Sequence, residues 1–211
     1  MKKNKISIIF NILIAIFEAI GLYLTFKNNG KFGFEFYTED SNFLALICST
    51  LYVIFLLKNK DKLPKWLKEF KYISTIGLTI TFLVVLFVLM PLYHFNYQFL
   101  LFKGSLLYHH LICPILAIIS FIFFDDVGKL VMKDTLYGLV FTLTYSVVLV
   151  TLNILHIVVG PYPFLMVYSQ SLYTSIIWFI CLTSFSFLIS YTLMRFYMIY
   201  RYKGNNKKTH V

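Results

Sequence analysis

Charged residues are scarce in this chain of 211 residues. Asp, Glu, Lys and Arg make up 13% of the sequence, whereas hydrophobic residues make up 59%. Soluble domains average about 25% charged and about 45–50% apolar residues. The composition therefore excludes a single soluble globular domain and indicates that lipid surrounds much of the chain.

Cysteine motifs are missing as well. The three cysteines, Cys48, Cys113 and Cys181, each stand alone in an apolar block, with no CxxC pair and no CxxCH haem-attachment motif. This excludes the common cysteine-based metal and haem sites, and we expect all three to be buried small residues.

Long apolar blocks dominate what is present. A helix needs about 20 mostly apolar residues to cross the hydrocarbon core. We therefore predict an all-α fold, a polytopic membrane helical bundle that forms one integral membrane domain over residues 1–211. Its roughly six transmembrane helices are expected at about 6–26, 41–57, 73–92, 105–124, 136–159 and 172–197.

Basic residues predict the orientation. The chain has 19 Lys and Arg against nine Asp and Glu, a formal charge of +10. With six alternating spans, only Lys27, Lys31 and Lys103 fall on one side, so the positive-inside rule makes the other side, with both termini, cytoplasmic. We expect a multi-pass protein of the cell membrane whose partner is membrane lipid rather than nucleic acid, with a short interfacial helix over residues 61–71.

Polar residues gather toward the non-cytoplasmic leaflet in this topology. Their positions in the sequence are far apart, and the candidates are Thr38, Ser41, Asn42, His109, His110, His156, Tyr162 and Pro163. Polar groups inside a membrane are costly and often functional. A simpler alternative is that Thr38 or Ser41 caps the second span and that His156 bonds a carbonyl at a helix end.

The adjacent histidines His109 and His110 point about 100° apart on a helix, so one of them can face the bundle. Pro114 removes the hydrogen bond to the carbonyl of His110. A membrane tolerates such a break only where protein or water covers it. We therefore expect a small polar cavity beside His110, the alternative being a kink that serves packing alone.

Glu18 stands near the middle of the first span. A carboxyl group at this depth must be neutral or paired. It is either a proton-coupling residue or a structural hydrogen-bond partner, and the sequence does not choose between them.

Three short stretches carry a family resemblance: FYTEDSNFLALI from Phe36, LLYHHLICPIL ahead of and through Pro114, and GPYPF over residues 160–164. In this order they resemble the family of the androgen-induced protein and the androgen-dependent TFPI-regulating protein, multi-span membrane hydrolases with bacterial integral-membrane relatives. The resemblance implies six spans and, from the animal members, a threonine hydrolase acting on fatty acid esters of hydroxy fatty acids.

The resemblance also implies roles for individual residues. Thr38 would be the nucleophile, and the base would be His110 by the bacterial-type spacing or His109 by the animal-type spacing. Asn42 and the turn over residues 162–164 would support the site. The sequence departs from the pattern in the acidic pair Glu39 and Asp40, and in having no acidic residue shortly after Pro114.

The leading hypothesis is thus an intramembrane Thr/His hydrolase of fatty acyl esters that needs no cofactor and no metal. The alternative is a small membrane transporter or lipid-binding protein that uses Glu18 and the intramembrane histidines. A third hypothesis is metal or haem binding by His94, His109, His110 and His156. The sequence specifies no oligomeric state.

Overall fold

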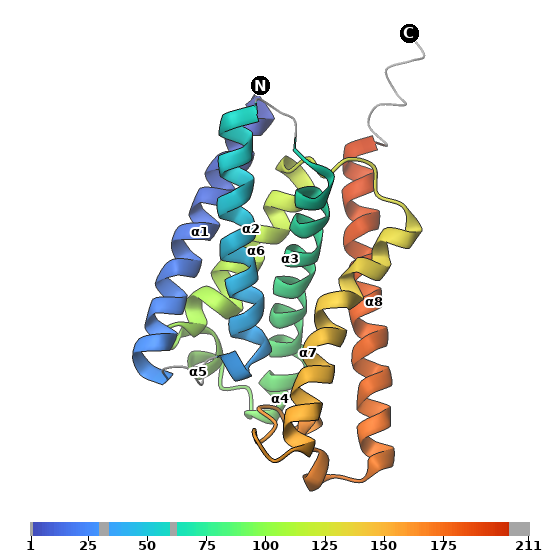
Figure 1. Cartoon of the computed structure of the whole chain (residues 1–211). Coiled ribbons are helices and arrows are strands. Elements are labelled where there is room, and N and C mark those ends of the chain that lie inside the picture. The colour runs from blue at the N-terminus through green and yellow to red at the C-terminus, as the bar shows by residue number, and fades with distance from the viewer. Residues whose placement is uncertain (1, 30–33, 60–62, 203–211) are drawn as a thin grey trace.

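The computed structural model describes residues 2–29, 34–59 and 63–202, and within these ranges it is helical with no strand (Figure 1). The α-helices are α1 (Lys2–Asn29), α2 (Tyr37–Asn59), α3 (Lys65–Val84), α4 (Met90–Leu92), α5 (Tyr97–Phe102), α6 (Cys113–Ile119), α7 (Tyr137–Ile154) and α8 (Leu172–Tyr202). Three π-helical segments, Val85–Leu89, Tyr108–Ile112 and Ser120–Phe124, join α3 to α4 and flank α6. Short 3₁₀ helices lie at Met132–Leu136, Pro163–Leu165 and Val167–Ser169.

Five helices of the described residues are long and apolar enough to cross a membrane. They are Asn4–Asn28, Tyr37–Lys58, Lys65–Leu92, Met132–Ile154 and Leu172–Tyr202. The sixth expected span is a shorter apolar helix, Tyr108–Phe124. At a rise of about 1.5 Å per residue it is about 25 Å long. The all-helical bundle is confirmed, and its helices are compatible with a membrane protein.

Several expected boundaries were wrong. The helix α3 begins at Lys65, directly after Pro64, and runs unbroken into the third span, so residues 65–71 do not form a separate interfacial helix; residues 61 and 62 lie outside the described part. The fifth span ends at Ile154 rather than near residue 159, because His156 has a φ of 58° that an α-helix does not allow.

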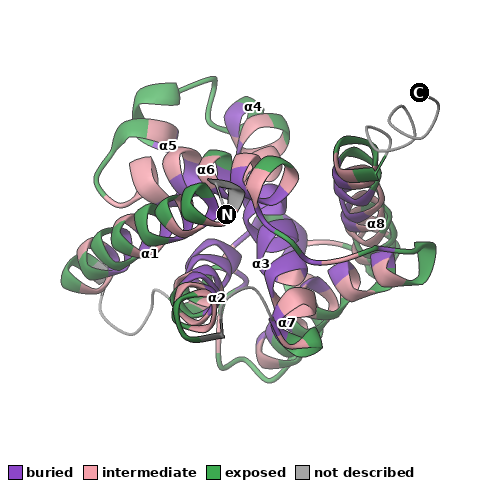
Figure 2. Cartoon of the chain, turned by 90° about the horizontal axis from the view of Figure 1, so that it is seen from above, coloured by how far each residue is buried: buried purple, intermediate pink, exposed green. Residues whose placement is uncertain are grey.

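The central helix of the bundle is α3. It contacts α2, α6, α7 and α8, and Figure 2 shows it in the middle with mostly buried residues. In the 18-residue apolar stretch of each helix, 56% of the residues are buried in Lys65–Leu92, which contains α3, but only 11% in α8. The outward faces remain strongly apolar, as expected for helices in lipid rather than water.

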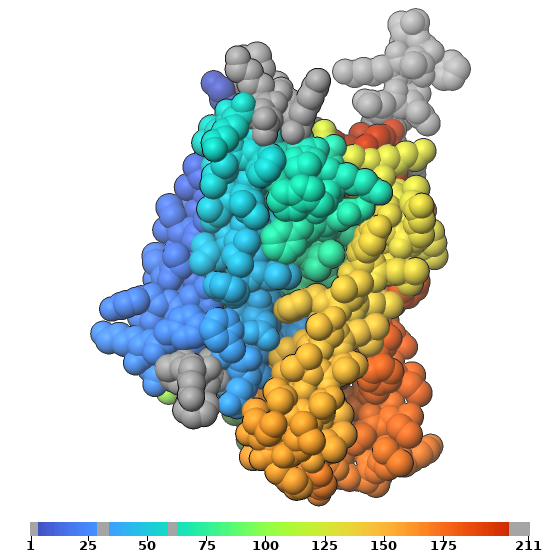
Figure 3. Space-filling model, in the orientation of Figure 1, coloured from blue at the N-terminus to red at the C-terminus, as the bar shows by residue number. Residues whose placement is uncertain are grey.

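The first and last helices begin and end, respectively, at the same end of the bundle. The start of α1 and the end of α8 are at one end of the bundle, which we call the terminal end; α2 begins at the opposite end, which we call the site end (Figure 1). The space-filling view shows α2, α3 and α7 packed side by side between these ends (Figure 3).

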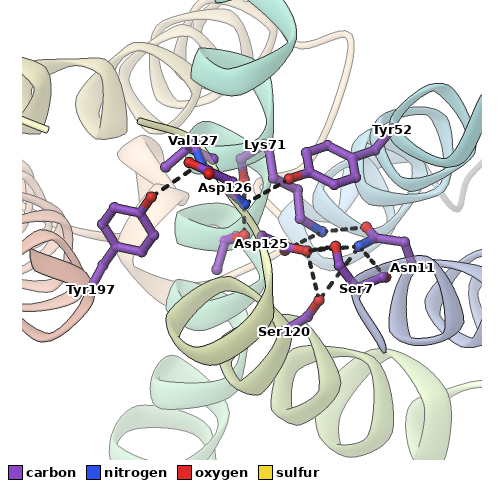
Figure 4. A network of polar contacts seen from close by, with 10 residues as sticks. Ser7, Asn11, Tyr52, Lys71, Ser120, Asp125, Asp126, Val127 and Tyr197 are labelled. Atoms are coloured by element: carbon purple, nitrogen blue, oxygen red, sulfur yellow. Dashed lines mark hydrogen bonds and ion pairs between the residues drawn. The ribbon is translucent and has the colours of Figure 1, made fainter. Parts of the chain in front are cut away.

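A buried polar network ties the helices together toward the terminal end (Figure 4). The Lys71 ammonium lies 3.5 Å from the Asp125 carboxylate and donates to Asn11 Oδ1 at 2.7 Å. Ser7, Asn11 and Ser120 donate to the other Asp125 oxygen. Lys71 is therefore not a loop residue exposed to water, as the charge count had assumed, because it lies in α3 and is 1% exposed.

The cysteines follow the expectation in two of three cases. Cys48 and Cys113 are buried, whereas Cys181 is exposed on the outward face of α8.

Candidate functional site

Thr38 lies in the first turn of α2, at the site end. Its backbone carbonyl accepts two hydrogen bonds from its own helix, from Ser41 Oγ at 3.0 Å and from Asn42 Nδ2 at 2.6 Å. Ser41 also pairs with the Thr81 hydroxyl of α3 at 2.9 Å. Ser41 and Asn42 therefore hold Thr38 in place, and neither side chain serves as a cap on the backbone N–H groups of this turn.

His110 faces Thr38 across the bundle. It belongs to the π-helical segment Tyr108–Ile112, which precedes Pro114 and which replaces the kinked α-helix expected there. His110 Nε2 lies 3.4 Å from Thr38 Oγ1, and His110 Nδ1 lies 2.7 Å from the carbonyl oxygen of Leu100. A carbonyl can only accept, so neutral His110 carries its proton on Nδ1 and presents the lone pair of Nε2 to Thr38.

A cavity of about 550 Å³ opens beside this pair. Thr38, Glu39, His110, Tyr162 and Pro163 are among its lining residues, so a cavity lies beside His110 as expected, but it is larger and more apolar than the small polar cavity that was predicted. The cavity combines these polar groups with apolar side chains from the third span and α5. It is large enough for part of an organic substrate as well as water.

Tyr162 comes from the loop between α7 and α8 and lies against the first turn of α2. Burial raises the pKa of Tyr162 well above its ordinary value, and its hydrogen bonds to Thr38 and to the Tyr37 backbone offset only part of this effect. The hydroxyl therefore stays protonated and can donate a hydrogen bond into the cavity.

His109 faces away from Thr38, between two carboxyl groups. Its Nε2 lies 3.9 Å from Glu18 Oε2 of α1 and its Nδ1 lies 3.7 Å from Glu39 Oε1 of α2. Among the residues that the structure describes, neither ring nitrogen of His109 has a hydrogen-bond partner. An added Cβ at Gly21 would overlap the His109 ring, so glycine is what lets α1 approach this closely.

The structure thus brings together only part of the predicted set. Thr38, His110, Tyr162 and Pro163 line one cavity, and Ser41 and Asn42 support Thr38 from behind. Glu18 lies beyond His109 and does not line this cavity. His156 is outside it too; its ring stacks on Tyr168 at 4.4 Å between centroids, past the end of α7.

Sequence reasoning missed two partners. The Leu100 carbonyl fixes the orientation of His110, and no side-chain pattern could have indicated a backbone group of α5. Glu39, which the sequence marked only as a departure from the family pattern, is 6% exposed and faces His109. Its position one residue after Thr38, in the first turn of a long apolar helix, was the available signal.

Metal binding gains no support from the side-chain geometry. Within residues 2–29, 34–59 and 63–202, no three His, Cys, Asp or Glu side chains are grouped so as to hold a metal ion. Glu18 and Glu39 approach opposite nitrogens of His109, so they cannot bind one ion together with the same ring atom.

Comparison with known proteins adds no assignment. No family model, no curated protein and no solved structure matches this chain. The family resemblance therefore stays a prediction, and a functional proposal has to depend on the geometry around Thr38.

Proposed function

We propose that this protein is a cell-membrane hydrolase of fatty acyl esters that uses Thr38 as nucleophile and His110 as general base. The proposal includes six membrane crossings, with the short helix Tyr108–Phe124 as the fourth, and cytoplasmic termini. Two observations favour this orientation: α1 starts and α8 ends at the same end, and most Lys and Arg residues belong to that side.

The observation that carries the proposal is the chain of contacts from Thr38 to His110 to Leu100. A threonine hydroxyl becomes an effective nucleophile when an adjacent base takes its proton. Nε2 of His110 is 3.4 Å from the hydroxyl, and the 2.7 Å hydrogen bond at Nδ1 fixes the ring and its tautomer. Hydrogen bonds in a catalytic group without substrate are often long and shorten when substrate binds.

The chemistry follows from this arrangement. Thr38 Oγ1 attacks the ester carbonyl carbon while its proton moves to His110 Nε2, which gives a tetrahedral oxyanion. The oxyanion collapses, the bond to the alcohol oxygen breaks, and His110 returns the proton to the departing alcohol. Water then attacks the acyl-Thr38 ester with His110 again as base, which releases the fatty acid and restores Thr38.

Tyr162 and Glu39 fit supporting roles. The protonated Tyr162 hydroxyl next to Thr38 is suited to donate to the developing oxyanion, at the positive end of the α2 dipole. Glu39 lines the same cavity, where its carboxyl group can stabilise the His110 imidazolium that forms. His109 is a weaker choice of base, because its nitrogens face Glu18 and Glu39.

The test is ester hydrolysis and fluorophosphonate labelling of detergent-purified protein. We expect Thr38→Ala to abolish both and His110→Ala to lower turnover about 10²- to 10⁴-fold, the usual contribution of a general base. Thr38→Ser should keep measurable activity because it keeps the hydroxyl. Thr50→Ala is the matched control, since Thr50 is on the same helix, exposed, and bonded only to its own helix at Leu46.

Full turnover in Thr38→Ala would refute the mechanism. If His109→Ala lost turnover while His110→Ala stayed active, the general base would be His109 rather than His110. If folded wild-type protein neither hydrolyses esters nor reacts with the probe, the hydrolase proposal fails as a whole.

A second candidate function is favoured by the buried group of Glu18, His109 and Glu39. Glu18 and His109 are fully buried; Glu18 lies in the membrane-length helix Asn4–Asn28, and His109 lies near the start of the shorter apolar helix Tyr108–Phe124. Buried ionisable groups of this kind bind protons in transporters. A proton-coupled transporter or lipid-binding protein would use these three residues and would form no product.

A further inference from the structure

Thr38 borders a second cavity on the side away from His110. This cavity lies between α2, α3, α7 and α8, and its inner part holds about 40 Å³ of free space. Thr38 and Tyr162 line both this cavity and the larger one that contains His110. An ester carbonyl at Thr38 would therefore have one half in each cavity.

The inner cavity offers little to a polar ligand, because most of its hydroxyls already have partners in the protein. Tyr37 is bonded to Thr142 at 3.0 Å, the Tyr145 hydroxyl donates to the Glu35 carbonyl at 2.8 Å, and Ser186 donates to the Leu182 carbonyl at 2.8 Å. Apart from Thr81 and Ser146, the rest of the wall is aliphatic or aromatic and includes Ile80, Val84, Val85, Leu89, Leu182 and Phe185. Such a wall is suited to hydrocarbon.

The cavity continues outward between α7 and α8. A second part of about 190 Å³ shares Thr142, Ser146 and Leu182 with the inner part. Ile176 and Phe179 line this outer part and are 48% and 49% exposed, so it reaches the surface of the bundle between the neighbouring helices α7 and α8.

The surface at this opening is apolar. Ile176 and Phe179, which line the outer part, are both apolar and exposed. In a membrane these side chains face lipid tails. The passage from Thr38 therefore leads sideways into the hydrocarbon region.

We propose that the passage between α7 and α8 binds the acyl chain of the substrate, with the carbonyl at Thr38 and the methyl end directed toward the lipid. The narrow inner part admits a single alkyl chain and no ring or headgroup. The alcohol half of the ester then occupies the larger cavity beside His110. This inference deepens the proposed hydrolase and takes the position of the ester from it, but chain binding can be measured without turnover.

The experiment uses full-length protein in detergent and a palmitate probe with a photoreactive diazirine near its methyl end. In wild type, crosslinks should map to the lining of the outer part, near Val150 and Phe179. Ser146→Phe puts a ring into the shared segment and should reduce crosslinking at least tenfold. The matched control is Val147→Phe, one residue along the same helix and directed outward, which should leave crosslinking unchanged.

Hydrolysis supplies the second measurement. Ser146→Phe should lose activity toward palmitoyl esters and keep activity toward acetyl esters, which do not reach the blocked segment. Retained acetyl-ester turnover also shows that the variant is folded.

The outcomes separate the two proposals. If wild-type crosslinks scatter over the outer surface, or if Ser146→Phe treats long and short esters as wild type does, the acyl passage is wrong although the hydrolase stands. If the probe maps to the passage and Ser146→Phe blocks it, but no ester is hydrolysed by wild type, the passage stands and the hydrolase fails.

Discussion

Replacing Lys71 should strongly destabilise this protein, because Lys71 belongs to a buried ion pair toward the terminal end. The ammonium is 3.5 Å from Asp125, and the two side chains are 2% and 0% exposed. With an effective dielectric constant near 20, charges at this separation attract by about 5 kcal/mol. Removing one partner of a buried pair typically costs about 3–5 kcal/mol, because the other charge is left without compensation.

Lys71 is the charge partner of Asp125 at its Oδ2 atom. Asp125 Oδ1 accepts from Ser7, Asn11 and Ser120, but its Oδ2 has no hydrogen-bond partner and only Lys71 as counter-charge. We therefore expect Lys71→Met to lower the free energy of unfolding by about 3–5 kcal/mol. For a chain of this length that loss corresponds to a Tm lower by roughly 6–20 °C.

The assay is thermal and SDS-induced unfolding of the purified protein, arranged as a double-mutant cycle with Asp125→Asn. The double variant should be more stable than the sum of the single losses by about 2–3 kcal/mol, since it leaves no unpaired charge. Lys65→Met is the control on the same helix; Lys65 is 88% exposed and pairs only with Glu69, so the change should stay within about 0.5 kcal/mol. Additive losses, or a Lys71→Met variant as stable as wild type, would refute the reasoning.

Two further predictions concern other ionisable groups. Glu18→Gln should leave ester hydrolysis within a few-fold of wild type, because Glu18 lies beyond His109 and does not line the Thr38 cavity; loss of pH-driven uptake in this variant, with no hydrolysis by wild type, would favour the transporter instead. Burial disfavours the charged form of Asp126, but its hydrogen bond and ion pair with Arg201 at 2.6 Å outweigh this and hold the pKa of Asp126 below its ordinary value. The contribution of Asp126 to stability is therefore present above the unfolded pKa of about 3.9 and is lost as the pH falls through the lower folded value. As the solution is acidified, the free energy of unfolding should fall less steeply in Asp126→Asn than in wild type. Identical pH profiles of the two proteins would contradict this.

The sequence by itself determined the helical class and most of the spans. In lipid each backbone N–H and C=O must be satisfied within its own segment, so apolar length alone predicts a helix. Because successive spans alternate in direction, the sequence also predicted that Thr38, His110 and Tyr162 lie toward the same end of the bundle. It also indicated the interruption before Pro114, because a missing N–H is a local property of proline.

Only the tertiary structure decided which groups meet. Thr38 and His110 are 72 residues apart, and their contact depends on how each helix is rotated about its axis, which packing with neighbours determines. His109 and His110 are equivalent in the sequence; the π-helical segment and the close approach of α1 at Gly21 turn the first toward Glu18 and the second toward Thr38. Helix rotation is set by side chains far apart in the chain, and a 100° difference between neighbouring residues is enough to exchange a candidate base for a histidine buried between two carboxyl groups.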